Sequence, residues 1–328
     1  MFSVVVTVYN KDEYINRAID SVLLQTFNEF QLIIVDDGSM DNSLALICAY
    51  DDSRIKVVTQ ENKGAGAARN TGIQNASNQW VAFLDADDVW TSEHLNELKI
   101  LIEQFQGVGI VATKSTEIKA NHKSSSSSRG LFTAAKFKQH KRQIVDYFIF
   151  AAKHPGHVHS SSVAIKREVF SVVGHFKLAK QGEDSEFWAR VCLSYPCAVS
   201  DNPTSFYYRG TNGIMEQQWL GNIQRQAKIN SIKDIGFAVS FLVDELGTIP
   251  VARKVGVVYF INNSIARSLK ISFFNGQITS MPFIGSLLIG KLELRFYIWR
   301  FLSKQPQWLL RTLYGMRSTM RNIYRKIK

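Results

Sequence analysis

The sequence predicts an α/β domain with a mixed, mainly parallel central sheet, followed by a mostly helical and basic C-terminal extension. In the first 90 residues, short apolar runs of strand length alternate with stretches that repeat apolar residues at helical spacing. This alternation over short connections is typical of βαβ units, whose strands are parallel. Beyond about residue 215 the strand pattern disappears and the helical pattern continues. We therefore expect two domains, residues 1–215 and residues 216–328.

Each expected element of the first domain follows from its own stretch of sequence. The apolar run 4–8 predicts the first strand, and acidic residues followed by apolar residues at i, i+3 and i+4 predict a helix after it. The same criteria predict strands at 31–35, 54–59, 80–84, 109–112, 158–165 and 204–209, and helices at 44–50, 64–76, 93–105, 167–173 and 182–195. The serine-rich stretch 122–129 has low complexity and predicts a surface loop.

The composition limits the class of protein. A hydrophobic content of 45% with 20% charged residues excludes wholesale disorder. The three cysteines lack metal-ligand spacing, which is typical of reduced thiols in a cytosolic protein. No stretch reaches the roughly 18 uninterrupted apolar residues of a spanning helix, and the first residues have no signal-peptide pattern. We therefore expect a cytoplasmic location.

The positive charge is concentrated at the C-terminal end. Residues 251–328 contain 14 Lys and Arg and one acid, Glu293, so their charge is +13 while the whole chain has +11. An apolar seam runs from Leu309 to Ile327 in steps of four and three residues, with arginines beside it. A helix lying on anionic lipid at the inner face of the cytoplasmic membrane explains the seam and the charge together. Packing of the seam onto the protein's own body explains the seam equally well. Nucleic acid is not expected as a partner, because no recognised binding motif accompanies the charge.

Three carboxylates follow the strand expected at 80–84, namely Asp85, Asp87 and Asp88. Open α/β sheets bind their ligands at the carboxyl ends of the strands, where polar residues at 7–10 and 36–39 are also expected. Carboxylates this close together repel one another unless a cation or a strong donor lies between them. The alternative is an acidic turn that only caps the following helix.

The glycines before the helix expected at 64–76 invite comparison with nucleotide-binding motifs. The dinucleotide fingerprint requires a third glycine at position 69, where this chain has Arg69, so a dehydrogenase is excluded. No P-loop pattern occurs either. Arg69, one turn into a glycine-opened helix, is placed to meet an anion. An arginine that is paired within the protein is equally consistent with this spacing.

Five blocks of residues resemble, in order and rough spacing, the motifs of family 2 glycosyltransferases, which have the GT-A fold. The blocks are Val4–Asn10, Ser21–Phe27, Val35–Ser39, Gly64–Gly72 and Phe83–Asp88. A looser resemblance continues through Gly182–Trp188 and Phe206–Arg209, so that residues 1–215 are covered. The resemblance implies the inverting transfer of a sugar from a nucleotide diphosphate sugar, usually a UDP-sugar, to an acceptor hydroxyl.

The resemblance also implies roles for single residues. Asp87 is expected to bind a divalent cation, Mn²⁺ or Mg²⁺, with Asp88 beside it, because these cations prefer a few carboxylate oxygens together with phosphate and water. Asp184 is expected to be the base that accepts the proton of the acceptor hydroxyl. Acids in a first helical turn also satisfy the helix dipole, and Glu183 is the alternative base. The residues expected to bind the nucleotide are Thr7, Tyr9, Asp37, Arg69, Asp85 and Arg209.

The remaining expectations concern partners and competing functions. His157 and His159 alternate near the start of an expected strand and are expected at the rim of the pocket, because two histidines without a third ligand do not predict zinc. The acceptor is expected to be a glycan or a lipid-linked glycan of a cell-surface polysaccharide. A nucleotidyltransferase and a non-catalytic nucleotide- or glycan-binding module are the alternatives. The sequence predicts neither the donor sugar nor the oligomeric state.

Overall fold

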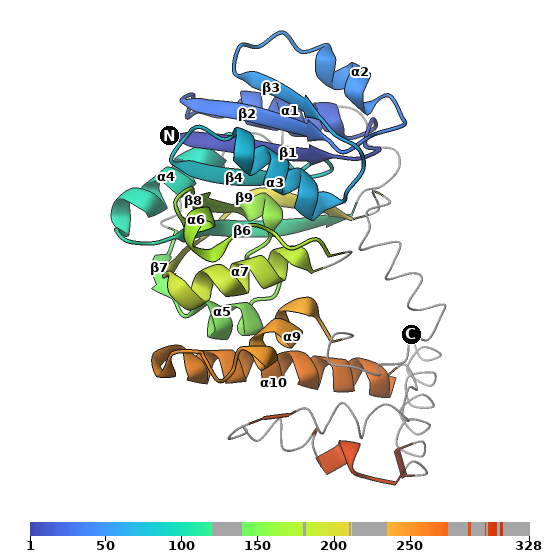
Figure 1. Cartoon of the computed structure of the whole chain (residues 1–328), viewed down its shortest axis with the longest axis vertical. Helices are drawn as coiled ribbons and strands as arrows, with labels where there is room; N and C mark the ends of the chain where they lie inside the picture. Colours follow the sequence, from blue (N-terminus) through green and yellow to red (C-terminus); the bar gives the residue numbers. More distant parts are fainter. Residues whose placement is uncertain are drawn as a thin grey trace, which may run out of the picture. The chain divides into compact units, whose positions relative to one another are not determined.

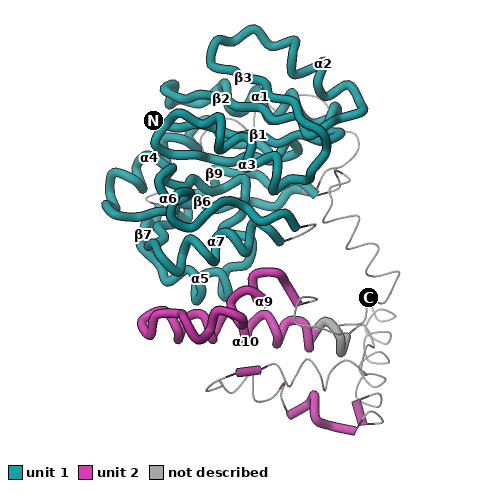
Figure 2. Tube along the Cα trace, in the orientation of Figure 1, with its two compact units in different colours: residues 1–217 teal, residues 218–328 magenta. Residues whose placement is uncertain are grey.

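The computed structural model describes residues 1–119, 140–179, 182–209, 211, 235–274, 288–289, 299, 301–306 and 309–310 (Figure 1). The chain divides into two compact units, residues 1–217 and residues 218–328, which are coloured separately in Figure 2. The first unit is an α/β domain built on one sheet. The second unit, as far as it is described, is helical. The serine-rich stretch 122–129 lies outside the described residues.

The N-terminal half of the sheet is parallel throughout. Its strands, in the spatial order β3-β2-β1-β4, are β3 (Ile55–Thr59), β2 (Phe30–Asp36), β1 (Phe2–Val8) and β4 (Trp80–Asp85). The pairing registers place Val8 beside Asp36 and Thr7 beside Asp85. The polar strand ends therefore meet at one edge of the sheet, as the sequence predicted.

The other half of the sheet mixes both directions. Its strands are β8 (Val163–Lys166), β6 (Ile110–Lys119), β9 (Cys197–Arg209), β5 (Val89–Trp90) and β7 (Arg142–Val145). β8 is antiparallel to β4 and β6, β9 is parallel to β6, and β5 and β7 are antiparallel to β9. In the described part of the chain this gives a nine-stranded mixed sheet flanked by helices, so the predicted fold class is confirmed.

Helices cover the sheet on both faces because its strands are apolar on both sides. The α-helices of this unit are α1 (Ile15–Leu23), α2 (Ser43–Cys48), α3 (Ala65–Asn75), α4 (His94–Gln104), α5 (Tyr147–Lys153), α6 (Val169–Val173) and α7 (Glu183–Ser194). Alternate β1 residues Val4, Val6 and Val8 share one apolar cluster with α1 and α4. Figure 1 shows α3 and α7 drawn in front of the sheet.

Close packing of α3 on β1 explains one glycine of the resemblance. A Cβ atom on Gly72 would lie 2.2 Å from Cγ1 of Val5, a distance that side chains do not tolerate. Only glycine lets the helix approach this closely without a shift of the strand. Gly72 therefore holds α3 close enough to bring Arg69, one turn earlier, over the end of β4.

The strand expected at 158–165 is wrong in its first half. Residues Ser160–Ser162 form a short 3₁₀ helix, η2, and β8 begins only at Val163. The reason is local hydrogen bonding: the Ser161 amide donates to Nδ1 of His159, and the His159 amide donates to Oγ of Ser162. Such side-chain acceptors offer the backbone an alternative to a strand ladder. The strands β5 and β7 and the helix α5 were not expected at all.

In the second unit, α9 (Phe237–Asp244) precedes the long helix α10 (Val251–Phe274). α10 buries one stripe at four-residue spacing, formed by Val257, Ile261, Ile265 and Leu269. Asn262 exchanges two hydrogen bonds with the backbone of Ile289, at 2.7 and 2.9 Å. Within the described residues, every helix is too short or too polar to span a bilayer. Most of the seam expected between Leu309 and Ile327 lies outside those ranges.

Candidate active site

The turn after β4 brings three carboxylates together and gives each a different partner. The turn is closed by the Asp88 amide, which donates to the carbonyl of Asp85 at 3.0 Å. The amide of Asp85 donates to Oγ of Ser161 at 3.1 Å, and its Oδ1 accepts from Arg69 at 2.8 Å. The side chain of Asp85 is 32% exposed. Asp85 is thus held in place while its second carboxylate oxygen remains accessible.

Asp88 is fully buried, and the protein uses both of its carboxylate oxygens. Ser161 donates its hydroxyl to Oδ2 at 2.5 Å, and the Tyr208 amide donates to Oδ1 at 3.0 Å. Burial raises the pKa of Asp88 well above its ordinary value, and the charges of Asp87 and Asp85 raise this pKa further. The expectation that Asp88 binds a metal therefore does not fit its surroundings. In the structure Asp88 ties the turn to η2 and to β9.

Asp87 forms an ion pair with a lysine, as Asp85 does with Arg69. Its Oδ2 accepts hydrogen bonds from Nζ of Lys11 at 2.7 Å and from Oγ1 of Thr211 at 2.8 Å. Its main-chain carbonyl accepts from Arg17 at 2.8 Å, and the guanidinium of Arg17 lies 3.7 Å from the centre of the Tyr208 ring. These contacts fix both the backbone and the side chain of Asp87.

Arg69 is buried between two carboxylates from different elements. Its side chain donates to Asp85 at 2.8 Å and to Glu183, the first residue of α7, at 2.7 Å. Burial by itself would lower the pKa of Arg69, but the charges of Asp85 and Glu183 outweigh burial and raise this pKa. Because both terminal nitrogens are occupied, the place expected for Arg69 against the base or phosphate is not seen. The internally paired alternative describes the structure, and Arg69 fastens the end of β4 to the start of α7.

The start of α7 presents Asp184. Gly182, with φ of 77°, lets the chain turn into the helix. Glu183 is 8% exposed and holds Arg69, whereas Asp184 is half-buried and makes its described hydrogen bonds only with Ser185, at 2.6 and 3.2 Å. Of these two acids, Asp184 is therefore the one with a carboxylate available to a ligand.

His159 lies close enough to Asp85 and Asp184 for their charges to affect its pKa. Burial lowers the pKa of His159, while the charges of Asp85 and Asp184 act in the opposite direction. Because Nδ1 accepts the Ser161 amide, the proton of the neutral ring is on Nε2. Nε2 is buried and has no hydrogen-bond partner within the described ranges. By contrast, His157 contacts the Ser200 carbonyl at 3.1 Å. The sequence placed both histidines at a rim and carried no signal that distinguishes them.

At the far end of the same sheet edge, Asp37 organises a loop. It is buried and accepts hydrogen bonds from the Gln60 side chain at 2.7 Å and from the amides of Lys63 and Gly64 at 2.9 and 2.8 Å. Its neighbour Asp36 is also buried, and its Oδ1 has no partner among the residues described. Thus Asp37 shapes the loop that leads into α3.

The other expected nucleotide contacts lie at this edge or beyond it. Thr7 is the β1 residue paired with Asp85, and Tyr9, just past the strand, is 41% exposed. Arg209 ends β9, where it forms an ion pair with Glu117 at 3.1 Å and is 55% exposed. Thr7 and Tyr9 therefore join the carboxylates at the same edge. The described contacts of Arg209 point to β6 instead.

The donor set fits a metal ion that is held only in part by protein. Among the described residues there is no group of three or more His, Cys, Asp or Glu disposed around one point. The carboxylates of Asp87 and Asp85 are oxygen donors, each with one oxygen that makes no described hydrogen bond. Mg²⁺ and Mn²⁺ suit such a set, because they take one or two carboxylates and complete their shell with water and phosphate.

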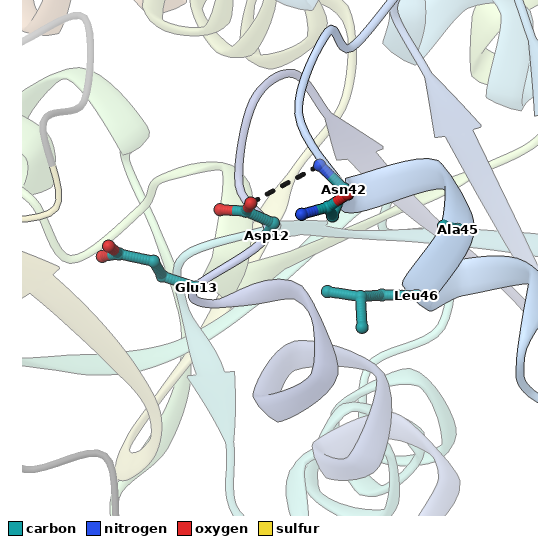
Figure 3. A pocket seen from close by; sticks show the side chains of 5 residues that line it. All are labelled: Asp12, Glu13, Asn42, Ala45 and Leu46. Atoms are coloured by element: carbon teal, nitrogen blue, oxygen red, sulfur yellow. Dashed lines mark hydrogen bonds between the residues drawn. The ribbon is translucent and has the colours of Figure 1, made fainter.

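An open hollow of about 570 Å³ near α1 and α2 is a separate feature (Figure 3). Its lining includes Asp12 and Glu13, and Asp12 accepts a hydrogen bond from the Asn42 amide at 3.4 Å. None of the expected site residues lines this hollow. Its lining residues include two carboxylates and no basic side chain, so it would repel an anionic nucleotide, whereas Lys11 and Arg69 lie beside the carboxylates of the sheet edge. The carboxyl edge of the sheet is therefore the better candidate for the site.

Known structures share this fold. The Staphylococcus aureus TarS 1–349 structure in complex with UDP-GlcNAc superimposes with a TM-score of 0.66 at 19% identity, covering 97% of this chain and 91% of that one. The mannosyltransferase PcManGT from Pyrobaculum calidifontis, in complex with GDP-Man and Mn²⁺, gives a TM-score of 0.54 at 16% identity, covering 99% and 87%. The fold is therefore GT-A-like.

Sequence comparison gives the family. The model of glycosyl transferase family 2 matches residues 3–173, which is more than half of the chain. This chain belongs to glycosyl transferase family 2. A glucosyltransferase of Escherichia coli, UDP-Glc:alpha-D-GlcNAc-diphosphoundecaprenol beta-1,3-glucosyltransferase WfgD, is 42% identical over 29% of this chain and 38% of its own. Glycosyltransferase GlyA of Streptococcus pneumoniae is 28% identical over 66% of this chain and 32% of its own. The chain thus spans about a third of the length of these relatives.

Proposed function

We propose that this chain is an inverting glycosyltransferase that moves a sugar from a UDP-sugar to an acceptor hydroxyl. The observation that carries the proposal is the buried bridge through Arg69, which joins Asp85 at the end of β4 to Glu183 at the start of α7. The bridge sets the carboxylates proposed for the diphosphate end of the donor at a fixed position from Asp184, the proposed base. Such fixed geometry is what a single displacement requires.

In this mechanism Asp184 receives the proton of the acceptor hydroxyl while the hydroxyl oxygen forms its bond to the anomeric carbon. The bond from that carbon to the diphosphate breaks at the same time, on the opposite face of the sugar. Asp87, with Asp85 beside it, would hold Mn²⁺ or Mg²⁺, and the ion would stabilise the charge of the departing diphosphate. Arg69 keeps Asp85 oriented, and Arg17 keeps the Asp87 backbone in place.

The uridine end is proposed to lie along Thr7, Tyr9 and Asp37, with Arg209 reaching the diphosphate. The common edge of β1, β2 and β4 supports the placement of Thr7, Tyr9 and Asp37, whereas Arg209 would have to leave its ion pair with Glu117 to reach the diphosphate. The donors named for structural neighbours, UDP-GlcNAc for TarS and GDP-Man for PcManGT, support a nucleotide sugar. The UDP-Glc named for WfgD favours a uridine nucleotide.

The proposed acceptor is a lipid-linked glycan of a cell-surface polysaccharide. The diphosphoundecaprenol-linked substrate in the name of WfgD supports this proposal, and so does the charge of +13 on residues 251–328. We propose that residues 1–215 are the catalytic domain and that residues 216–328 rest on the anionic inner face of the cytoplasmic membrane. Co-sedimentation of the full chain with anionic vesicles, but not with neutral ones, is expected. Combined substitution Arg317→Gln, Arg321→Gln and Arg325→Gln should weaken this binding, and an unchanged pellet would refute the role of the tail.

The activity is tested by release of UDP from a panel of UDP-sugars in the presence of Mn²⁺. Asp87→Ala and Asp184→Asn should each abolish most of the turnover, while Asp51→Asn, which removes an exposed acid on the same domain, should not change it. Turnover that is unchanged in both site variants would refute the assignments. Release of sugar 1-phosphate in place of UDP, with transfer of the uridylyl group, would point to a nucleotidyltransferase.

A further inference from the structure

The loop between β1 and α1 holds one lysine in a fixed position beside Asp87. The amide of Lys11 donates to Oγ of Ser43 at 2.8 Å, and its carbonyl accepts the amides of Tyr14 and Ile15, both at 2.9 Å. The main chain of Lys11 is therefore fastened to α2 on one side and caps α1 on the other. A lysine in an ordinary surface loop has no such constraints.

The residue before it has an unusual backbone conformation. Asn10 has a φ of 51°, the only positive φ of a non-glycine residue in the described part of the chain. Its amide donates to Oγ of Ser39 at 3.1 Å, and its Oδ1 accepts the Met40 amide at 2.8 Å. Asparagine tolerates this left-handed region better than most residues, and such conformations persist where the surroundings impose them. These contacts fix the backbone before Lys11, so the side chain of Lys11 leaves the loop in one direction.

That direction is the proposed diphosphate end of the site. Nζ of Lys11 donates to Oδ2 of Asp87 at 2.7 Å and to the Thr211 carbonyl at 3.0 Å. An ammonium group has three donors, and the described residues supply no hydrogen-bond acceptor for the third. The ring of Tyr14 lies 5.7 Å from Nζ, and the Lys11 side chain is 15% exposed. A ligand at Asp87 can therefore reach the ammonium group.

We propose that Lys11 binds the diphosphate of the donor. The inference rests on the proposed function and adds a residue to it. The side chains of Lys11 and Asp87 are only 15% and 16% exposed, and the cost of removing such charges from water offsets much of their attraction, so stability alone does not account for a lysine held beside Asp87. An ammonium group fixed beforehand where negative charge develops stabilises a leaving diphosphate, and it supplements the cation on Asp87.

The test is calorimetric titration of the full chain with UDP, UMP and uridine, each with Mn²⁺ and with EDTA. Lys11→Gln should lower the affinity for UDP about 10- to 100-fold, the range for a charge-assisted hydrogen bond, and should leave the affinity for uridine unchanged. Lys11→Arg should recover most of the lost UDP affinity. The control is Lys56→Gln, which removes the same charge from an exposed position on β3 and should bind all three ligands like the parent.

Each other result overturns the proposal. Equal loss of UDP and uridine affinity in Lys11→Gln would show that Lys11 only supports the fold of the loop. Unchanged UDP affinity would show that Lys11 does not meet the diphosphate. A parent chain that binds none of the three ligands would refute the proposed function itself. The parent titration therefore tests the proposed function, and the titrations of the Lys11 variants test the role of Lys11.

Discussion

Two buried networks of charge in the α/β unit differ in whether the protein completes them. Glu97 on α4 is 4% exposed and accepts four hydrogen bonds. Two come from Arg142 at 2.6 and 2.8 Å, one from Ser200 at 2.6 Å, and one from Asn202 at 3.0 Å. The network joins α4 to β7 and to β9. Because Glu97 is buried and each of its carboxylate oxygens already accepts two hydrogen bonds from protein groups, we expect this network to stabilise the fold.

The network around Arg69 is open. Asp85 is 32% exposed, and buried nitrogens of Arg69 and His159 have no hydrogen-bond partner among the described residues. Buried polar groups are normally satisfied, so these two nitrogens distinguish the network from that of Glu97, and the exposed carboxylate of Asp85 is the part that a ligand can reach. The two networks differ in exposure: Glu97 is enclosed by protein groups, whereas Asp85 keeps an exposed carboxylate that a ligand can reach. The following predictions test this difference, from the largest expected effect to the smallest.

The largest effect is expected for Asp184→Asn. Removing the proposed base should lower kcat by about 10²–10⁴-fold, which corresponds to about 3–5 kcal/mol of transition-state stabilisation. The melting temperature should stay within about 1 °C, because the described hydrogen bonds of Asp184 involve only Ser185. Steady-state kinetics and calorimetric melting measure the two quantities. A variant with a lower melting temperature and the kcat of the parent would show that Asp184 supports the fold and is not the base.

Glu97→Gln should show the opposite pattern. An amide cannot accept the paired donors of Arg142, so unfolding should become easier by about 3 kcal/mol, the lower end for a broken buried pair because the Arg142 side chain is 25% exposed. For a unit of this size, the loss is about 6–12 °C in Tm. Denaturant unfolding measures it, and kcat of the folded fraction should equal that of the parent. Glu103→Gln, on an exposed residue of the same helix, is the matched control.

Arg69→Lys tests whether the bridge from Asp85 to Glu183 contributes to stability, to activity or to both. A single ammonium group cannot span both Asp85 and Glu183, so one charge-assisted hydrogen bond is lost, which costs about 2 kcal/mol. Because the bridge positions the site, kcat/KM should fall by about 10-fold or more, in addition to the loss of stability. Loss of stability with full kcat/KM would show that the bridge belongs with the Glu97 network.

The pH dependence of stability separates the networks by sign. Burial by itself would raise the pKa of Glu97. Hydrogen bonds from Arg142 and Ser200 outweigh burial, so the pKa of Glu97 lies below its ordinary value of 4.5. The contribution of Glu97 is therefore present above pH 4.5 and is lost as the pH falls through the folded-state pKa. The pKa of Asp88 is raised above 3.8 by burial, so its contribution is present below pH 3.8 and is lost as the pH rises through the folded-state pKa.

The smallest effect is expected in how steeply the free energy of unfolding changes with pH. Asp88→Asn mimics the protonated acid, so the parent should lose stability relative to this variant as the pH rises from 4, by at most about 1.4 kcal/mol per pH unit. Glu97→Gln should instead reduce the loss of stability that the parent shows as the pH falls below 4.5. Denaturant midpoints measured between pH 4 and 9 provide the comparison. A constant difference between the parent and Asp88→Asn over this range would contradict the raised pKa.

The sequence by itself determined the elements that local energies control. The strands at 2–8, 30–36 and 80–85 are mainly apolar on both faces, and such strands are typical of a parallel sheet that is covered on both sides. The edge where Thr7, Asp36 and Asp85 meet followed from that parallel arrangement. The family followed from five motifs in order. Where a polar side chain competed with the strand ladder, at Ser160–Ser162, the local pattern gave the wrong element.

Only the tertiary structure decided which charges pair. Lys11 meets Asp87 across 76 positions, Arg69 meets Glu183 across 114, and Asp88 meets the Tyr208 amide across 120. Spacing along the chain cannot encode such pairs, because the strength of each depends on burial and on the distance between elements that are far apart in sequence. The three acids of Asp85–Asp88 look equivalent in the sequence. Folding pairs Asp85 with Arg69 and Asp87 with Lys11 and buries Asp88 against Ser161 and the Tyr208 amide, so each acid has a different partner in a medium that screens charge poorly.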